Sequence, residues 1–218
     1  MAITAVGSAY KNAIGAGKTT LAVTPTAIGN CLVVGAWVGT AITTVSGGGC
    51  TDWTRLVGPF LGTGGVYLKD IWLGTISTTG ASTITFSGTA GSFAGYLGQE
   101  FAGGVGGAGT VWALDVSGTR SNTASTSIAY PTLVPGGTLR LYVGVAANGS
   151  TTNTTVTSGY TLQALATGSF PMIWHPNVST SQSPTSGQVS STSQTIGVCI
   201  TASAAPTYKP GQFMPFFM

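Results

Sequence analysis

The chain has 218 residues and a net charge of +3, and only 5% of its residues are charged, against roughly 25% in an ordinary soluble domain. This low charge argues against most cytosolic enzymes, which use charged side chains for solubility and for chemistry. The hydrophobic fraction of 43% supplies enough apolar surface to build a core, which argues against simple disorder.

Short apolar runs rich in Val, Ile, Thr and aromatic residues, separated by Gly, Asn, Pro and Ser, are typical of β-strands. In Ser82–Phe86 polar and apolar residues alternate, which places Ile84 and Phe86 on one face. With no window of helical spacing, the pattern predicts an all-β chain that forms a jelly-roll-like, two-sheet β-sandwich. In chain order, strands are expected at Ile3–Val6, Thr19–Val23, Cys31–Val38, Trp53–Val57, Val66–Leu73, Ser82–Phe86, Phe93–Phe101, Thr110–Val116, Ser127–Tyr130, Thr138–Val145, Val156–Leu162, Phe170–His175 and Gln194–Ala202.

A faint internal repeat divides the sandwich domain, residues 1–203, into two candidate half-repeats, 1–109 and 110–203. The alignment places Val34 opposite Val143 and Trp72 opposite Trp174. The matched segments are Cys31–Val38 with Leu139–Ala146, Trp53-Thr54 with Tyr160-Thr161, and Val66–Trp72 with Phe170–Trp174. If the repeat is genuine, each half contributes part of one sandwich, because neither half alone is expected to have a second layer. Chance similarity between two β-rich halves is the alternative.

The last residues, 204–218, are predicted to form an extended apolar arm. Three prolines in this segment prevent a helix and favour an extended chain. Because an exposed apolar segment promotes aggregation, we expect the arm to be buried, either on its own sandwich or, as the favoured alternative, against another chain. The predicted contact residues of the arm are Tyr208, Phe213, Met214, Phe216, Phe217 and Met218.

Residues with catalytic or ligand-binding potential are few. The segment Gly15–Leu21 resembles a phosphate-binding loop, but Asn12 occupies the position of its first glycine and a strand is expected to follow. There is one histidine, His175, and no spacing brings two of the four acidic residues together. We therefore predict a protein that is not an enzyme and has no catalytic, cofactor or metal site.

Three cysteines, Cys31, Cys50 and Cys199, show no C-x-x-C spacing, so a structural zinc site is not expected. The sequence favours three free thiols, and a Cys31–Cys199 disulfide is the alternative.

The surface predicted by this composition favours protein partners. The basic residues are scattered, so no nucleic-acid footprint is expected, and the uncharged stretches are broken by Gly, Pro and hydroxyl residues, so no membrane insertion is expected. A surface with few charges tends to associate, which favours packing against copies of itself or other proteins. Exposed loops are expected at 147–155 and 176–193, and they make binding of a host-surface glycan an alternative function.

Four segments of the first half carry a family resemblance. They are the "L-V-V-G" run in Gly29–Val38, the "W-T-R" of Thr51–Leu56, the Tyr–Trp spacing in Val66–Trp72, and the alternating "T-I-T-F-S-G" in Gly80–Gly88. In these segments the chain resembles β-sandwich virion proteins of tailed bacteriophages, notably those of actinobacteria, which are often called minor tail proteins. The resemblance covers roughly residues 1–105 well and the remainder loosely.

The resemblance implies a setting rather than an active site. It implies a non-enzymatic structural protein, assembled in the bacterial host cytoplasm and present in the virion in many copies together with other virion proteins. The first expectation is a minor tail or tail-tip protein. A decoration protein that stabilises the head from the capsid exterior is the second.

Overall fold

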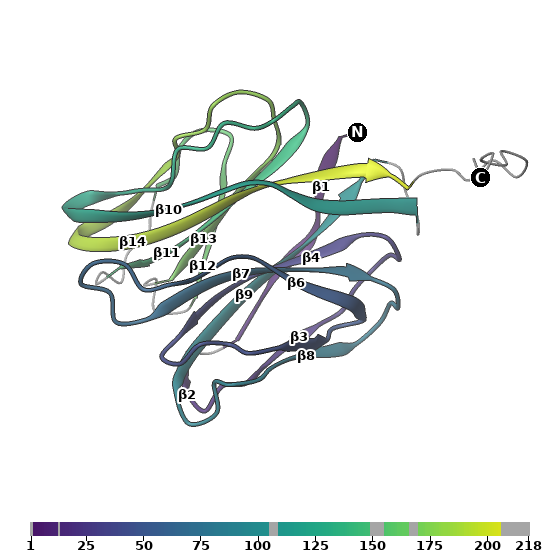
Figure 1. The fold of residues 1–218 in the computed structure, drawn as a ribbon, viewed down its shortest axis with the longest axis horizontal. Helices are drawn as coiled ribbons and strands as arrows, with labels where there is room; N and C mark the ends of the chain where they lie inside the picture. The colour runs from purple at the N-terminus through teal and green to yellow at the C-terminus, as the bar shows by residue number, and fades with distance from the viewer. Residues whose placement is uncertain (1, 13, 105–108, 149–154, 166–169, 206–218) are drawn as a thin grey trace, which may run out of the picture.

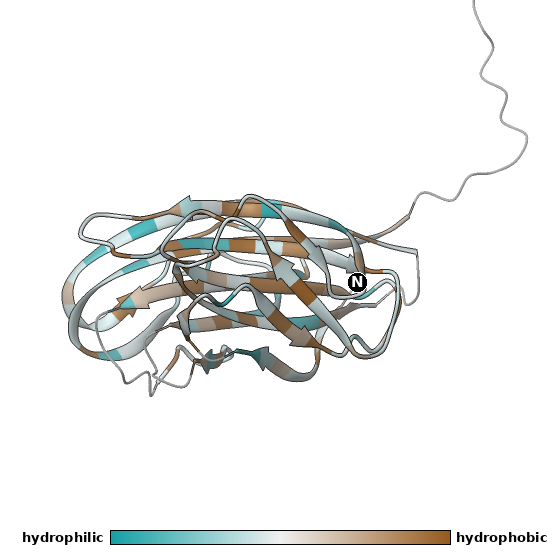
Figure 2. Ribbon diagram, turned by 90° about the horizontal axis from the view of Figure 1, so that it is seen from below, coloured by the Kyte–Doolittle hydropathy of each residue, from teal (hydrophilic) through white to brown (hydrophobic). Residues whose placement is uncertain are grey.

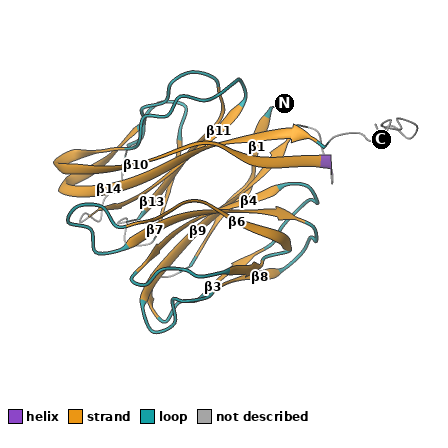
Figure 3. Cartoon of the chain, in the orientation of Figure 1, coloured by secondary structure: helices purple, strands orange, loops and turns teal. Residues whose placement is uncertain are grey.

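The computed structural model describes residues 2–12, 14–104, 109–148, 155–165 and 170–205. They form β-strands arranged in three antiparallel sheets (Figures 1 and 3), and the predicted all-β sandwich is confirmed. We name the sheets by their strand orders: sheet I is β1-β9-β4-β7-β6 with β2 beside β9, sheet II is β10-β14-β11-β13-β12, and sheet III is β3-β8-β5.

The strand bounds of sheet I are β1 (Ile3–Lys11), β2 (Gly15–Ala16), β4 (Cys31–Val38), β6 (Cys50–Phe60), β7 (Leu68–Ile76) and β9 (Phe93–Gly103). Those of sheet II are β10 (Thr110–Ala129), β11 (Arg140–Asn148), β12 (Thr161–Ala164), β13 (Pro171–Val178) and β14 (Thr185–Ala204). Sheet III contains β3 (Thr20–Val23), β5 (Val45–Gly47) and β8 (Ser82–Phe86).

Sheet I lies between sheet II and sheet III (Figure 1), so the expectation of two sheets is wrong. Every residue of β4 is buried, because its alternate side chains enter two different cores. Val33 and Trp37 pack against sheet II, whereas Val34 packs against Ile84 and Phe86 of sheet III. Hydrophobic residues accordingly recur along the stacked strands (Figure 2). The shared face predicted for Ile84 and Phe86 is confirmed.

The two halves of the chain build sheets of the same topology. Sheet I uses only residues 3–103 and sheet II only residues 110–204. Among the five principal strands of each sheet, the spatial order is first, last, second, fourth and third. The strands matched by sequence, β4 with β11, β6 with β12 and β7 with β13, occupy the same places in this order. The topology therefore agrees with the strand pairs of the internal repeat.

The residue alignment of the repeat is nevertheless wrong by an odd number of positions. Val34 and Trp72 point into the core between sheets I and III, whereas Val143 and Trp174 point into the core between sheets I and II. A shift of one residue exchanges the two faces of a strand, so residues aligned in sequence do not play equivalent roles.

Each half also has a cover of its own, so the expectation that neither half has a second layer is wrong. Sheet III covers sheet I from within the first half. In the second half, isolated bridges join Leu133 to Gln182 and Val156 to Ser186. These segments cover a third core on the outer face of sheet II, where the Tyr142 hydroxyl donates to the Pro131 carbonyl over 2.9 Å.

Hydroxyl-rich segments form strands that the sequence did not predict. The stretch expected as an exposed loop, 176–193, is strand up to Val178 and again from Thr185 onward, and β10 continues to Ala129. Here β10 and β14 pair with each other, for example at Ser121 and Gln194. Backbone pairing stabilises these segments without the apolar alternation by which strands are recognised. The short strands β2 and β5 were also not predicted.

The predicted arm begins where the described structure ends. Ala204 is the last residue of β14, and all six predicted contact residues, from Tyr208 to Met218, lie outside the described residues. Within the described part of the chain, no helix is long and apolar enough to cross a membrane.

Candidate functional site

Asp70, which is fully buried, is held by an arginine. Arg55 Nε lies 2.9 Å from Asp70 Oδ1, and the Arg55 guanidinium also donates to the Ile42 carbonyl and lies 4.6 Å above the Trp72 ring. Burial raises the pKa of Asp70 to about 6, although the positive charge of Arg55 acts to lower it. This pair ties the edge strand β6 to its neighbour β7 and to the loop that follows β4.

Two other acids also fix the backbone of the fold. Glu100 is fully buried, and its carboxylate accepts hydrogen bonds from the Thr26 hydroxyl over 2.7 Å and from the Asn30 side-chain amide over 2.6 Å. Asp115 lies 3.3 Å from Arg140 and accepts from the Gly136 amide over 2.8 Å. These carboxylates are used to hold loops, which leaves them poorly placed for general acid–base chemistry.

The histidine is placed for packing. His175 lies in β13, and its ring meets the Tyr160 ring edge-on at 4.9 Å. Partial burial lowers its pKa. Among the described residues, no acid forms a hydrogen bond or an ion pair with His175, and no three His, Cys, Asp or Glu side chains gather as a metal site would require.

The cysteines and the glycine-rich segment have structural surroundings. All three cysteines are free, and Cys31 and Cys199 belong to different cores, so the alternative of a disulfide between them is wrong. The segment that resembles a phosphate-binding loop forms β2 and a turn at Gly17, and then enters β3. It therefore lacks the helix N-terminus on which phosphate binding depends.

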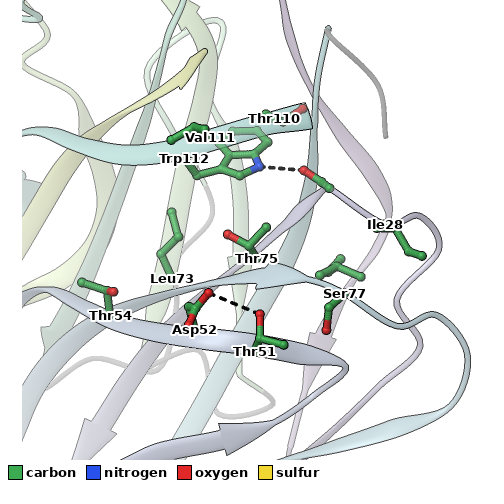
Figure 4. Close-up of a pocket in the computed structure, with 12 residues that line it drawn as sticks. Ile28, Thr51, Asp52, Thr54, Leu73, Thr75, Ser77, Thr110, Val111 and Trp112 are labelled. Atoms are coloured by element: carbon green, nitrogen blue, oxygen red, sulfur yellow. Dashed lines mark hydrogen bonds between the residues drawn. The ribbon is translucent and has the colours of Figure 1, made fainter. Parts of the chain in front are cut away.

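A groove lies between two edge strands (Figure 4). We call it the edge groove. Strand β6, at one edge of sheet I, and β10, at one edge of sheet II, form its walls, β7 forms its floor, and the segment before β4 closes one end. It encloses about 420 Å³, a volume of the order found in small-ligand sites. Its lining residues are Ile28, Gly29, Thr51, Asp52, Thr54, Leu73, Thr75, Ile76, Ser77, Thr110, Val111 and Trp112.

Apolar side chains dominate one part of the edge groove. Ile28 and Val111 are 45% and 43% exposed, a large exposure for aliphatic residues, and Leu73 lies in the floor. The Trp112 indole Nε1 donates to the Gly29 carbonyl over 2.8 Å, which fixes the ring as a wall. Asp52 gives the groove a negative charge, and its carboxylate accepts a hydrogen bond from the adjacent Thr51 hydroxyl over 3.3 Å.

The edge groove lies beside the start of the predicted arm. Ala204 pairs with Thr110, which lines the groove, and the Ala205 amide donates to the Gly109 carbonyl over 2.6 Å. Sequence reasoning did not find this groove, because its lining comes from four separate chain segments that carry no motif. The signal that could have been read was weak: Ile28 is an isolated aliphatic residue in the turn before β4, and Val111 is the second residue of β10.

The described structure does not bring the predicted glycan loops together as a site. Most of 147–155 lies outside the described residues, and the second segment, 176–193, is largely strand.

Comparison with known proteins gives no further assignment. No protein-family model matches the chain, and neither the curated proteins nor the solved structures contain a match.

Proposed function

We propose that this chain is a non-enzymatic structural protein of a tailed-phage virion that assembles with copies of itself and with other virion proteins through its C-terminal arm. The observation that carries the proposal is that charged side chains stabilise the fold while aliphatic side chains remain exposed to solvent. Asp70, Glu100 and Asp115 are used to hold the fold, whereas aliphatic residues such as Val111 are left exposed beside open sheet edges. Unpaired edges with apolar neighbours favour association with another chain.

The family resemblance supports the virion setting. Its four motifs fall in β4, β6, β7 and β8, and three of these strands are neighbours in sheet I. The motif residues pack in the cores or pair along the sheets, as expected of motifs that specify a framework. We place the protein first in the tail, as a minor tail or tail-tip protein, and second on the capsid exterior.

Labelling of intact virions tests this proposal. Antibody raised against the full chain is expected to mark the tail in negatively stained particles, and marking of the head would support the capsid alternative instead. Purified virions that contain none of the protein, by immunoblot against a dilution series of the pure chain, would refute the virion role.

A second experiment tests the arm. Removal of residues 213–218 is expected to abolish self-association, measured by sedimentation velocity, while the melting temperature of the sandwich is unchanged. Self-association at full strength without these residues would refute the role of the arm.

A further inference from the structure

We propose that the edge groove is the acceptor for the arm: it receives the apolar segment Phe213–Met218 from a second copy of the chain. This inference rests on the proposed function, because it names the surface to which the arm binds.

The shape and chemistry of the edge groove suit an extended apolar peptide. Its two walls are edge strands, so β6 and β10 each present a row of backbone groups that an added chain can use. Between them lie Leu73 and the Trp112 ring, with exposed Ile28 and Val111 at the rim. Covering these side chains with phenylalanine and methionine removes apolar surface from water on both partners.

The length of the arm favours a groove on another copy. Ala204 pairs with Thr110, which lines the groove, so the arm begins beside the groove of its own chain. From Pro206 to Phe213 there are eight residues, and a proline-rich chain of this length can span about 25 Å when extended, at about 3.1 Å per residue. A chain of this length that continued away from its own groove would reach the groove of a neighbouring copy.

Charge complementarity points to the same occupant. Lys209 is the one charged side chain in 204–218. Asp52 lies in the edge groove, exposed to solvent, and within the described part of the chain it is the one acid not used to hold a loop or an arginine. A lysine four residues before the apolar segment can meet this carboxylate while Phe213 and the residues after it lie among the aliphatic side chains. Such a pair orients the incoming arm more than it tightens binding.

The test compares groove variants with a matched surface variant in sedimentation velocity of the full chain. Val111→Asp and, independently, Ile28→Asp place a charge at the apolar rim and are expected to weaken self-association by about tenfold or more. Val134→Asp is the control, because Val134 is 67% exposed and does not line the groove; it is expected to associate like the wild type. Melting temperatures of all three variants check that the sandwich is intact.

A mixture then distinguishes a neighbour's groove from the chain's own. The Val111→Asp protein keeps its arm but has a blocked groove, and the protein lacking 213–218 keeps its groove but has no arm. Each alone is expected to be monomeric, and an equimolar mixture is expected to form a complex. If the mixture stays monomeric, the arm binds its own chain and the second copy is the wrong occupant.

The failure of this inference differs from the failure of the proposed function. If removal of 213–218 abolishes association but Val111→Asp and Ile28→Asp associate like the wild type, the arm binds elsewhere and the groove assignment is overturned. If removal of 213–218 has no effect on association, the assembly role of the arm fails, and the groove assignment fails with it.

Discussion

Gly35 allows a close approach between the two halves of the chain, and its replacement by alanine tests how tightly they pack. Gly35 lies in β4 of sheet I, and a Cβ atom placed there would lie 2.4 Å from Cγ1 of Val145 in β11 of sheet II. Real Cβ atoms do not approach another carbon this closely, and Val145 is fully buried. The sheets must therefore separate, or the valine must leave its preferred rotamer.

The expected cost follows from opposing contributions. Overpacking of a core typically costs about 1–3 kcal/mol. Alanine is intrinsically more favourable than glycine within a strand by about 0.5–1 kcal/mol, which offsets part of that cost. We therefore expect Gly35→Ala to lower the free energy of unfolding by about 1–2 kcal/mol.

The double variant Gly35→Ala/Val145→Ala identifies the contact. Val145→Ala alone removes two buried methyl groups and is expected to cost about 2 kcal/mol, at about 0.8 kcal/mol for each group plus a cavity contribution. In the double variant the new methyl at position 35 enters the space vacated at 145. Its destabilisation should be smaller than the sum of the single effects by about 1 kcal/mol or more, as for residues in contact.

Equilibrium unfolding in urea, followed by tryptophan fluorescence, measures all three variants. Gly109→Ala is the matched control, because a Cβ there meets no atom within 4 Å, and its stability should equal that of the wild type within about 0.5 kcal/mol. Strictly additive effects, or a Gly35→Ala variant as stable as Gly109→Ala, would show that β4 and β11 do not pack as described.

Two further predictions concern buried ionisable groups. Because the pKa of Asp70 is raised to about 6 from 3.8, the folded state binds this proton more tightly than the unfolded state, and the associated stability is present below about pH 4 and lost as pH rises through 6. Each tenfold change in proton affinity corresponds to about 1.4 kcal/mol. In urea unfolding, the stability of Asp70→Asn relative to the wild type should therefore increase by about 2–3 kcal/mol between pH 4 and pH 7. A stability difference that does not change with pH would contradict this. Burial raises the pKa of Cys50 and of Cys199 to about 12 and that of Cys31 well above its ordinary value. A thiol-specific reagent at pH 8 should therefore react slowly with the native protein, whereas after denaturation it should modify all three thiols. A thiol that reacts rapidly in the native protein would contradict this.

The strands that alternate or form long apolar runs could be predicted, because burial determines their composition. Cys31–Val38 and Ser82–Phe86 were expected with the bounds that the structure has. The number of layers was not predicted correctly, although Cys31–Val38 carried a signal, because a strand without alternation is buried on both faces. Such a strand requires a sheet on each side, and sheet I has both.

Two other features had no local signal. The outer parts of β10 and β14 are rich in Ser and Thr, and they are strands because they pair with each other across more than fifty positions of sequence. The edge groove likewise joins residues from β6, β7 and β10 that are far apart in the chain. Composition and spacing cannot reveal such neighbours, whereas they did indicate correctly that Ile84 and Phe86 share a face.

The consecutive placement of the two matching sheets has a consequence for how this molecule resists dilution. Sheet I ends at Gly103 and sheet II begins at Thr110, so the tether between the two faces is very short. A short tether gives the faces an effective concentration in the millimolar range, and their contact survives at any protein concentration. Two separate subunits would have to keep the contact surface equivalent on both sides. Joined in one polypeptide, the halves are released from that requirement, and each outer layer can specialise: one is a regular three-stranded sheet, and the other is a looser cover held by single bridges.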